Sequence, residues 1–198
     1  MKIINNSDSV IIVLHEIYGI NKYIDEICMK FSKLNYDIIC PNLIEVENPF
    51  SYDLQNEAYD HFINEIGFDL AAKKVKKLID KVKTQYKHIF ILGFSIGATI
   101  AWLCSDYYEI SGIIAYYGSR IRYYVKITPN CPVLLIFADD EPSFSPTELA
   151  KTLKALNVDV HILNGKHGFS DPFSSNYFKP SSKKAELLAY RFLNHYNN

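Results

Sequence analysis

The segment Gly93–Gly97, Gly-Phe-Ser-Ile-Gly, holds the residues whose types and spacing most directly suggest chemistry. A strand-like apolar run, His88–Leu92, precedes it, and the buried-helix pattern Ala98–Cys104 follows. A G-x-S-x-G between a strand and a helix is typical of a nucleophile elbow, a sharp turn that exposes the serine at its tip. A serine there can also merely cap the helix. The flanking elements favour a nucleophile at Ser95, with the N–H of Ile96 free to bind an anion.

Two further groups are needed before a serine can act as a nucleophile. Near neutral pH its hydroxyl requires an imidazole to accept the proton and a carboxylate to orient that imidazole. His167 lies in a Gly-flanked loop after the last predicted strand, and Asp139, Asp140 and Glu141 follow the strand before it. The order serine, acid, histidine is that of α/β-hydrolases. The sequence therefore predicts a triad of Ser95, His167 and one of the three acids.

The elements that must position these residues alternate along the whole chain. Apolar runs predict six strands: Ser9–Leu14, Tyr36–Cys40, His88–Leu92, Ile110–Tyr116, Pro132–Ala138 and Val158–Leu163. Helical patterns fall between and after them: Ile20–Leu34, a broken Tyr52–Ile66, Phe68–Lys87, Ala98–Cys104, Thr147–Leu156 and Ser181–Tyr196. This alternation predicts an α/β fold, a mostly parallel sheet with helices on both faces. The strand ends, and the polar residues after them, then meet at one edge.

Composition limits the classes of partner. Hydrophobic residues make up 48% of the 198 residues and charged residues 22%, as in ordinary globular proteins. The net charge of −1 gives no electrostatic reason to expect nucleic-acid or membrane binding. The run Lys73–Lys77 has helical spacing and is interpreted as a solvated helix face. No linker divides the chain, so we expect one α/β-hydrolase domain spanning residues 1–198.

The cysteines and the first residues bear on cellular location. The four cysteines, Cys28, Cys40, Cys104 and Cys131, are scattered in apolar stretches without paired spacing. They are interpreted as reduced core residues of a reducing compartment. The first residues show no signal-peptide pattern, and no apolar stretch approaches the length of a membrane span. These observations predict a cytoplasmic protein.

Further segments resemble the dienelactone hydrolase family. The segment His15–Asn21, His-Glu-Ile-Tyr-Gly-Ile-Asn, is similar to the Glu-Ile-Phe-Gly-x-Asn segment of that family. The match continues in order through Asn56–Tyr59, Tyr116–Gly118, Pro132–Phe137 and His167–Phe169. The resemblance runs from about residue 10 to the C-terminus. It implies an α/β-hydrolase sheet and an esterase-type mechanism, with neither a metal nor another cofactor.

Two departures from the family pattern concern the catalytic groups. The best-known enzyme of the family has cysteine at the elbow, where this chain has Ser95, so ordinary serine-hydrolase chemistry is expected. In the cysteine enzymes the glutamate matched by Glu16 helps to activate the thiol; here Glu16 is expected to be a polar residue of the site wall. A gapless match from Pro132 places Glu141 on the family's aspartate. Glu141 is therefore the expected acid, with Asp140 as second choice and Asp139 as third.

A third departure concerns the substrate. The dienelactone enzymes hold the substrate carboxylate with arginines, and Gln55 and Asp171 stand at those two positions. Dienelactone itself is therefore not the expected substrate. Arg120 and Arg122 follow Tyr117 closely, but nothing in the sequence places them in the pocket.

The resulting hypothesis is a serine hydrolase acting on a small carboxylic ester, lactone or thioester. Oxyanion donors are expected at the N–H of Ile96, from the elbow, and of Ile17, from the resemblance. Tyr18, Tyr59 and Tyr117 are expected as pocket walls, although each could equally be a core residue.

Alternatives on the same scaffold stay open. An acyltransferase or a peptidase would use the same groups, because the fold does not fix the acceptor. A catalytically inactive hydrolase-fold protein that binds a ligand or partner is the alternative from another class. The sequence specifies neither the physiological substrate nor the oligomeric state.

Overall fold

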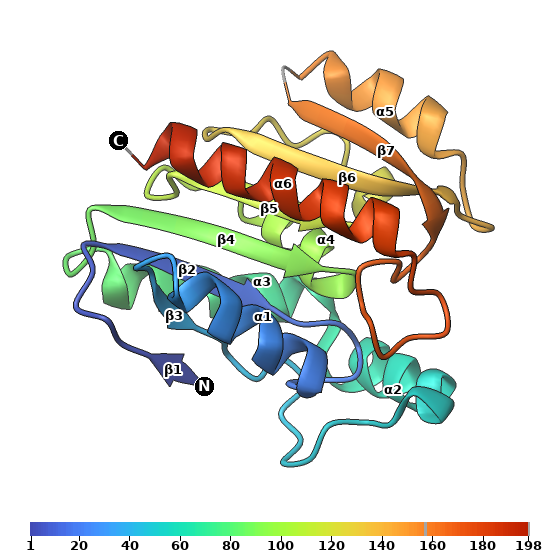
Figure 1. Cartoon of the computed structure of the whole chain (residues 1–198), viewed down its shortest axis with the longest axis horizontal. Helices are drawn as coiled ribbons and strands as arrows, with labels where there is room; N and C mark the ends of the chain where they lie inside the picture. The colour runs from blue at the N-terminus through green and yellow to red at the C-terminus, as the bar shows by residue number, and fades with distance from the viewer. Residues whose placement is uncertain (157, 198) are drawn as a thin grey trace.

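One twisted sheet forms the centre of the computed structural model, which describes residues 1–156 and 158–197. In these residues seven strands are ordered β1-β3-β2-β4-β5-β6-β7 (Figure 1). Their bounds are Lys2–Ile3 for β1, Ser9–Leu14 for β2, Asp37–Ile39 for β3, His88–Phe94 for β4, Gly112–Tyr116 for β5, Val133–Asp140 for β6 and Asp159–Lys166 for β7. All neighbouring strands pair in parallel except β1 and β3. The predicted mostly parallel sheet is confirmed.

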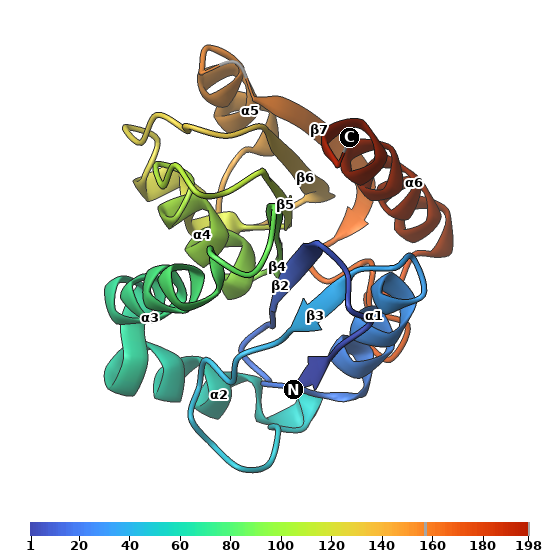
Figure 2. The same cartoon turned by 90° about the vertical axis from the view of Figure 1, so that its left-hand side faces the viewer.

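Helices cover both faces of this sheet. They are α1 (Lys22–Ser32), α2 (Gln55–His61), α3 (Gly67–Val82), α4 (Ile96–Leu103), α5 (Pro146–Lys154) and α6 (Lys179–Tyr196). Figure 2 shows α3 and α4 on one face and α1 and α6 on the other. Three short helical segments, η1 (Tyr52–Leu54), η2 (Phe62–Ile66) and η3 (Ser119–Tyr123), complete the described elements. None of the described helices is long and apolar enough to cross a membrane.

The central strands are apolar throughout because both of their faces are buried. In β2, Val10, Ile12 and Leu14 pack toward α3 and α4, whereas Ile11 and Val13 pack toward α1 and α6. This alternation is the two-residue period of a strand.

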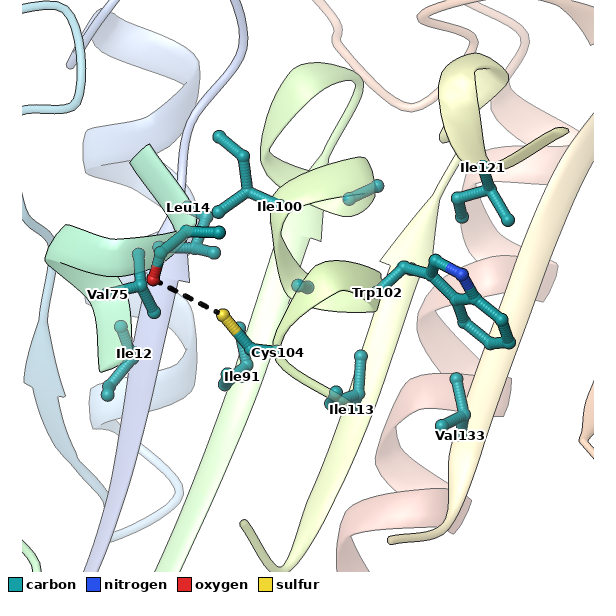
Figure 3. Packing of buried hydrophobic residues seen from close by; sticks show 14 of the residues in the cluster. Ile12, Leu14, Val75, Ile91, Ile100, Trp102, Cys104, Ile113, Ile121 and Val133 are labelled. Atoms are coloured by element: carbon teal, nitrogen blue, oxygen red, sulfur yellow. Dashed lines mark hydrogen bonds between the residues drawn. The ribbon is translucent and has the colours of Figure 1, made fainter. Parts of the chain in front are cut away.

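Packing against the sheet fixes the helix that follows Ser95. Figure 3 shows Ile12, Leu14 and Ile91 of the sheet beside the side chains of α4. The Cys104 thiol at the end of α4 donates to the carbonyl of Ala72 on α3, at 3.8 Å (Figure 3). Helix α4 is therefore held by both the sheet and its neighbouring helix.

An added strand and a shorter helix are among the differences from the sequence prediction. Strand β1 was not predicted, because two residues are too few for any periodicity to show; Lys2 pairs with Ile39 across an antiparallel ladder. Helix α3 ends at Val82 rather than at Lys87, because the residues after Val82 are polar and turn back toward the sheet. The N–H of Lys87 donates to the carbonyl of Asp8 at 2.7 Å. The predicted break within 52–66 is confirmed as η1, α2 and η2 in succession.

The two glycines of the elbow are required by close backbone approach. A Cβ atom on Gly93 would lie 2.3 Å from the carbonyl oxygen of Gly97. A Cβ atom on Gly97 would lie 2.2 Å from the carbonyl oxygen of Leu14 and 2.7 Å from that of His15. The obstructing atoms are backbone, so they cannot rotate away. Only glycine at both positions lets α4 start this close to the end of β2.

Gly97→Ala is therefore expected to destabilise the fold. Because α4 must shift away from β2, the free energy of unfolding should fall by about 3 kcal/mol or more, the upper range for overpacking. Urea denaturation measures this change. Gly118→Ala is the matched control, because its added Cβ would meet side-chain atoms of Ile121 and Ala98, at 2.7 and 3.0 Å, rather than backbone. Equal losses in the two variants would contradict the backbone explanation.

Candidate active site

Ser95 sits at the tip of the turn between β4 and α4. Its backbone is strained, with φ 53° and ψ −112°. Its N–H donates to the carbonyl of Tyr116 at 3.0 Å, and its carbonyl accepts from the N–H of Thr99 at 3.2 Å. The side chain makes no capping hydrogen bond to α4. The hydroxyl is thus directed away from the helix that follows it.

The Ser95 hydroxyl is hydrogen bonded to an imidazole that a carboxylate orients. Ser95 Oγ lies 2.9 Å from His167 Nε2, and His167 Nδ1 lies 2.8 Å from Glu141 Oε1. The Glu141 side chain is 3% exposed, whereas that of His167 is 34% exposed. With the proton on Nδ1 donated to Glu141, Nε2 is left to accept the serine proton. This arrangement meets the geometric requirement for a nucleophile, a base and an orienting acid.

Glu141 is the acid that the structure brings to the imidazole. Asp139 and Asp140 end β6 rather than follow it, which corrects the predicted end of that strand at Ala138. Asp139 Oδ1 accepts from the N–H of Gly165 at 2.8 Å, and Asp140 is exposed. Glu141, the first residue after β6, turns inward to His167.

His167 is supported by the loop after β7 and by an aromatic ring directly after β5. The Asn176 amide donates to the His167 carbonyl at 2.9 Å. The Tyr117 ring lies 5.0 Å from the imidazole, between centroids, and 5.5 Å from the ring of Phe169. Tyr117 is fully buried and does not line the cavity, so its prediction as a pocket wall was wrong. Its ring packs behind the histidine because the surrounding aromatic side chains enclose it.

A cavity of about 350 Å³ opens in front of the serine hydroxyl. The other predicted site residues border it: Ser95, His167, Glu141, Glu16, Ile17, Ile96, Tyr18 and Tyr59. Ile96 is the first residue of α4, where a backbone N–H has no acceptor within the helix. The N–H of Ile17 donates to no group in residues 1–156 and 158–197. Both predicted oxyanion donors are thus unpaired and border the cavity of the serine.

A buried histidine fixes the loop that carries Ile17. His15 Nδ1 donates to the carbonyl of Glu16 at 2.6 Å, while Nε2 accepts from the N–H of Leu43 at 2.8 Å. This pattern requires the neutral imidazole. Burial lowers the pKa of His15 to about 4, so the ring stays neutral near neutral pH.

Glu16 is a buried carboxyl group that borders the same cavity as Ser95 and His167. The residue is 5% exposed, and its Oε1 atom has no hydrogen-bond partner in the described residues. Burial raises the pKa of Glu16 to about 7, with the Asp171 charge acting in the same direction and His167 in the opposite one. The site therefore contains a second acid that is partly protonated near neutral pH.

The titration of Glu16 predicts a pH-dependent stability. Between pH values of about 4.5 and about 7 the folded chain keeps this proton and the unfolded chain loses it, so rising pH destabilises the fold. Glu16→Gln cannot ionise. The quantity to compare is the free energy of unfolding of Glu16→Gln minus that of the unmodified chain. This difference should increase by on the order of 3 kcal/mol between about pH 4 and about pH 8. Urea denaturation at the two pH values measures it.

The control for this prediction is Glu57→Gln, which changes an exposed carboxylate on α2. The difference in free energy of unfolding between Glu57→Gln and the unmodified chain should be nearly the same at both pH values. A Glu16→Gln difference that is equal at both pH values would contradict a raised pKa at Glu16.

Three site features were missed by sequence reasoning. Arg120 borders the cavity, Asn176 supports His167, and the Tyr52 hydroxyl donates to the buried carboxylate of Asp171. The signal available for Arg120 was its place shortly after a predicted strand, at the sheet edge where Ser95, Glu141 and His167 lie. Asn176 and Tyr52 lie in irregular or broken segments, where no periodicity indicates which way a side chain points.

Comparisons with known proteins place the chain in a family. The chain matches the Dienelactone hydrolase family over residues 3–197. It is 36% identical to the Bacillus subtilis protein YczH over 171 residues, which covers 85% of this chain and 83% of YczH. It is 28% identical to a Yersinia pestis protein provisionally named carboxymethylenebutenolidase, over 88% of this chain and 73% of that protein.

A solved structure shows the same architecture. The Pyrococcus furiosus esterase Pf2001 superposes with a TM-score of 0.70 at 15% identity, covering 98% of this chain and 86% of that one. The fold is therefore that of the α/β-hydrolases, as predicted. With the family match extending over almost the entire sequence, the chain belongs to the dienelactone hydrolase family and is a hydrolase.

Proposed function

We propose that the chain is a carboxylic ester hydrolase with a serine nucleophile, which cleaves a small ester, lactone or thioester through an acyl-enzyme on Ser95. The observation that carries this proposal is the hydrogen-bonded series Ser95, His167, Glu141 beside an open cavity. Relatives named as an esterase and as a carboxymethylenebutenolidase support the same reaction class.

Acylation follows from the positions of the three side chains. Ser95 Oγ attacks the substrate carbonyl carbon while its proton passes to His167 Nε2. Glu141 stabilises the resulting imidazolium through Nδ1. When the tetrahedral intermediate collapses, the bond to the leaving oxygen or sulfur breaks and His167 returns the proton to that atom. The acyl group remains on Ser95.

Deacylation repeats these steps with water. His167 takes a proton from the water as its oxygen attacks the acyl carbon, then protonates Ser95 Oγ as the carboxylic acid leaves. In both stages the negative oxygen is stabilised by the N–H groups of Ile96 and Ile17. Loss of one such donor typically costs about 100-fold or more in rate.

The cavity limits the size of the substrate. A volume of about 350 Å³ is at the lower end of small-molecule pockets. Tyr18 and Tyr59 contribute ring surfaces to its wall. The site suits short acyl chains and compact leaving groups rather than long lipid chains.

Hydrolysis of p-nitrophenyl acetate and butyrate tests the proposal. We expect a burst of p-nitrophenol equal to the enzyme concentration if deacylation is the slower step, followed by steady turnover. Release of the free acid, identified by mass spectrometry, separates hydrolysis from acyl transfer to an added alcohol or amine. A folded protein that binds these esters without releasing p-nitrophenol would support the inactive binding protein and contradict the proposal.

A further inference from the structure

We propose that the substrate is a short-chain ester of a sugar or of another polyhydroxylated alcohol, which the enzyme binds through the free hydroxyl groups of that alcohol. This inference rests on the proposed function and adds the class of alcohol to it. The observations behind it are the polar wall of the cavity, the hydrogen-bond groups left unused there, and the position of His167 beside the leaving group.

Polar side chains form most of the wall of the cavity in front of Ser95. In the described part of the chain, no Leu, Val, Phe, Met or Trp borders it, and its aliphatic residues are Ile17, Ile96 and Pro142. Small-molecule pockets are usually lined mainly by apolar side chains. A long acyl chain would find little apolar surface here and would cover polar groups without pairing them.

The cavity offers an acceptor and a donor of opposite charge. Within the described residues the Glu16 carboxyl group pairs with no cation, and its Oε1 atom has no hydrogen-bond partner. The Arg120 guanidinium group likewise pairs with no carboxylate there, and it contacts the hydroxyl groups and rings of Tyr59 and Tyr123. These contacts leave some of its five N–H donors unused. A ligand with a net charge would suit one of the two groups and oppose the other, so a neutral ligand is indicated.

Hydroxyl groups meet this requirement because each is neutral and both donates and accepts hydrogen bonds. Near neutral pH the Glu16 carboxyl group is divided between its ionised and protonated forms, since burial raises its pKa to about 7. A hydroxyl can donate to the carboxylate and accept from the carboxylic acid, whereas an ammonium group suits only the ionised form. A polyol therefore fits Glu16 in both forms and can also accept from Arg120.

An amide and aromatic rings complete the wall. Gln55 accepts from the Tyr18 hydroxyl at 3.4 Å, and its amide nitrogen donates to no group within residues 1–156 and 158–197. The rings of Tyr18 and Tyr52 meet edge to face, with 4.8 Å between their centroids. Tyrosine combines an apolar ring face with a polar hydroxyl. A sugar ring has the same division, with C–H groups on its faces and hydroxyl groups at its edge.

The loop that carries His167 indicates that the hydroxyl groups belong to the alcohol part of the ester. His167 Nε2 must reach the leaving oxygen to protonate it, so the alcohol lies beside this loop. The same loop borders the cavity with three polar residues, Ser174, Ser175 and Asn176. The Asn176 amide nitrogen donates to the His167 carbonyl, which leaves the side-chain oxygen to accept from a hydroxyl group of the substrate.

The kinetic test compares acetates that differ in hydroxyl groups. One pair is methyl 6-O-acetyl-α-D-glucopyranoside and tetrahydropyran-2-ylmethyl acetate, which have the same ring and the same ester group. The other pair is glycerol 1-acetate and propyl acetate, and release of acetic acid is followed by titration at constant pH. In at least one pair we expect kcat/KM for the hydroxylated ester to be about 10-fold higher or more, the worth of one or two hydrogen bonds.

Matched variants locate the hydroxyl-binding groups. Gln55→Leu and Arg120→Met should each lower the ratio about threefold or more, because each removes a hydrogen bond to the alcohol. Asn56→Leu and Arg122→Met are the controls, since these residues lie on the same helical segments but do not border the cavity. Both controls should leave the ratio unchanged. Thermal melting of each variant checks that the fold is retained.

Three results would overturn the inference. They are a ratio below about 10-fold in both pairs, a ratio that survives in both Gln55→Leu and Arg120→Met, and an equal loss in the control variants.

A binding measurement separates this inference from the proposed function. In the Ser95→Ala protein, the preferred hydroxylated acetate should bind about 10-fold more tightly than its partner in calorimetry. If this preference is found while the unmodified protein hydrolyses none of the esters, the polyol site stands and the hydrolase proposal fails. If the esters without hydroxyl groups are hydrolysed and no preference is found, only the assignment of the alcohol fails.

Discussion

Replacing Ser95 by alanine is expected to lower kcat for a p-nitrophenyl ester by about a million-fold, to the rate left by binding and the oxyanion donors alone. In the proposed mechanism the hydroxyl forms the acyl-enzyme, and in the described residues no other nucleophile is hydrogen bonded to His167 Nε2. The burst of p-nitrophenol should vanish together with the steady-state rate. Stopped-flow absorbance at enzyme concentrations comparable to that of the substrate measures both.

Ser143→Ala is the matched control for this variant. Ser143 borders the same cavity but is exposed and lies outside the hydrogen-bonded series. Its kcat should stay within about threefold of the unmodified value, because surface changes of this kind are close to neutral. A Ser95→Ala protein that retained more than about one hundredth of the activity would contradict the assignment of the nucleophile.

Removing the charge of Glu141 is expected to have the second-largest effect. Glu141→Gln keeps the shape of the side chain, but its amide can donate to His167 Nδ1 and so favour the tautomer with the proton on Nε2. That nitrogen then cannot accept the proton of Ser95. A loss of about 10,000-fold in kcat is expected from this kind of change.

Asp140→Asn is the comparison that decides between adjacent acids. Asp140 is exposed at the end of β6, so the kcat of Asp140→Asn should differ from that of the unmodified protein by less than about threefold. The kcat of Glu141→Asp should lie between those of Glu141→Gln and Asp140→Asn. The shorter carboxylate keeps its charge but lies farther from His167 Nδ1. A larger loss in Asp140→Asn than in Glu141→Gln would show that another acid orients the histidine.

Much of the fold could be predicted because its signals are local. Runs such as Ser9–Leu14 are buried on both faces, so each is apolar throughout and recognisable without knowledge of its neighbours. The elbow combines a strand, two glycines and a helix within a few residues, which makes Ser95 recognisable. The place of Glu141 next to His167 depends on parallel strands ending at one edge, a rule that needs only the order of elements.

The remainder depends on contacts that no local pattern contains. Whether Tyr117 faces the cavity or packs behind His167 depends on its neighbouring aromatic rings, which come from distant segments. Arg120 reaches the cavity because η3 turns back after β5, and its lack of a carboxylate partner becomes visible only when every neighbouring side chain is placed. The raised pKa of Glu16 likewise follows from burial, which the sequence does not reveal.

The most direct test of the account is covalent labelling with a fluorophosphonate, which reacts readily with a serine hydroxyl that a neighbouring base activates. Intact-mass spectrometry should show one adduct per chain, and peptide mapping should place it on Ser95. Ser95→Ala should remain unlabelled, and His167→Ala should react far more slowly. A folded protein that forms no adduct, or one that is labelled elsewhere while Ser95 stays free, would contradict the central claim that Ser95 is an activated nucleophile.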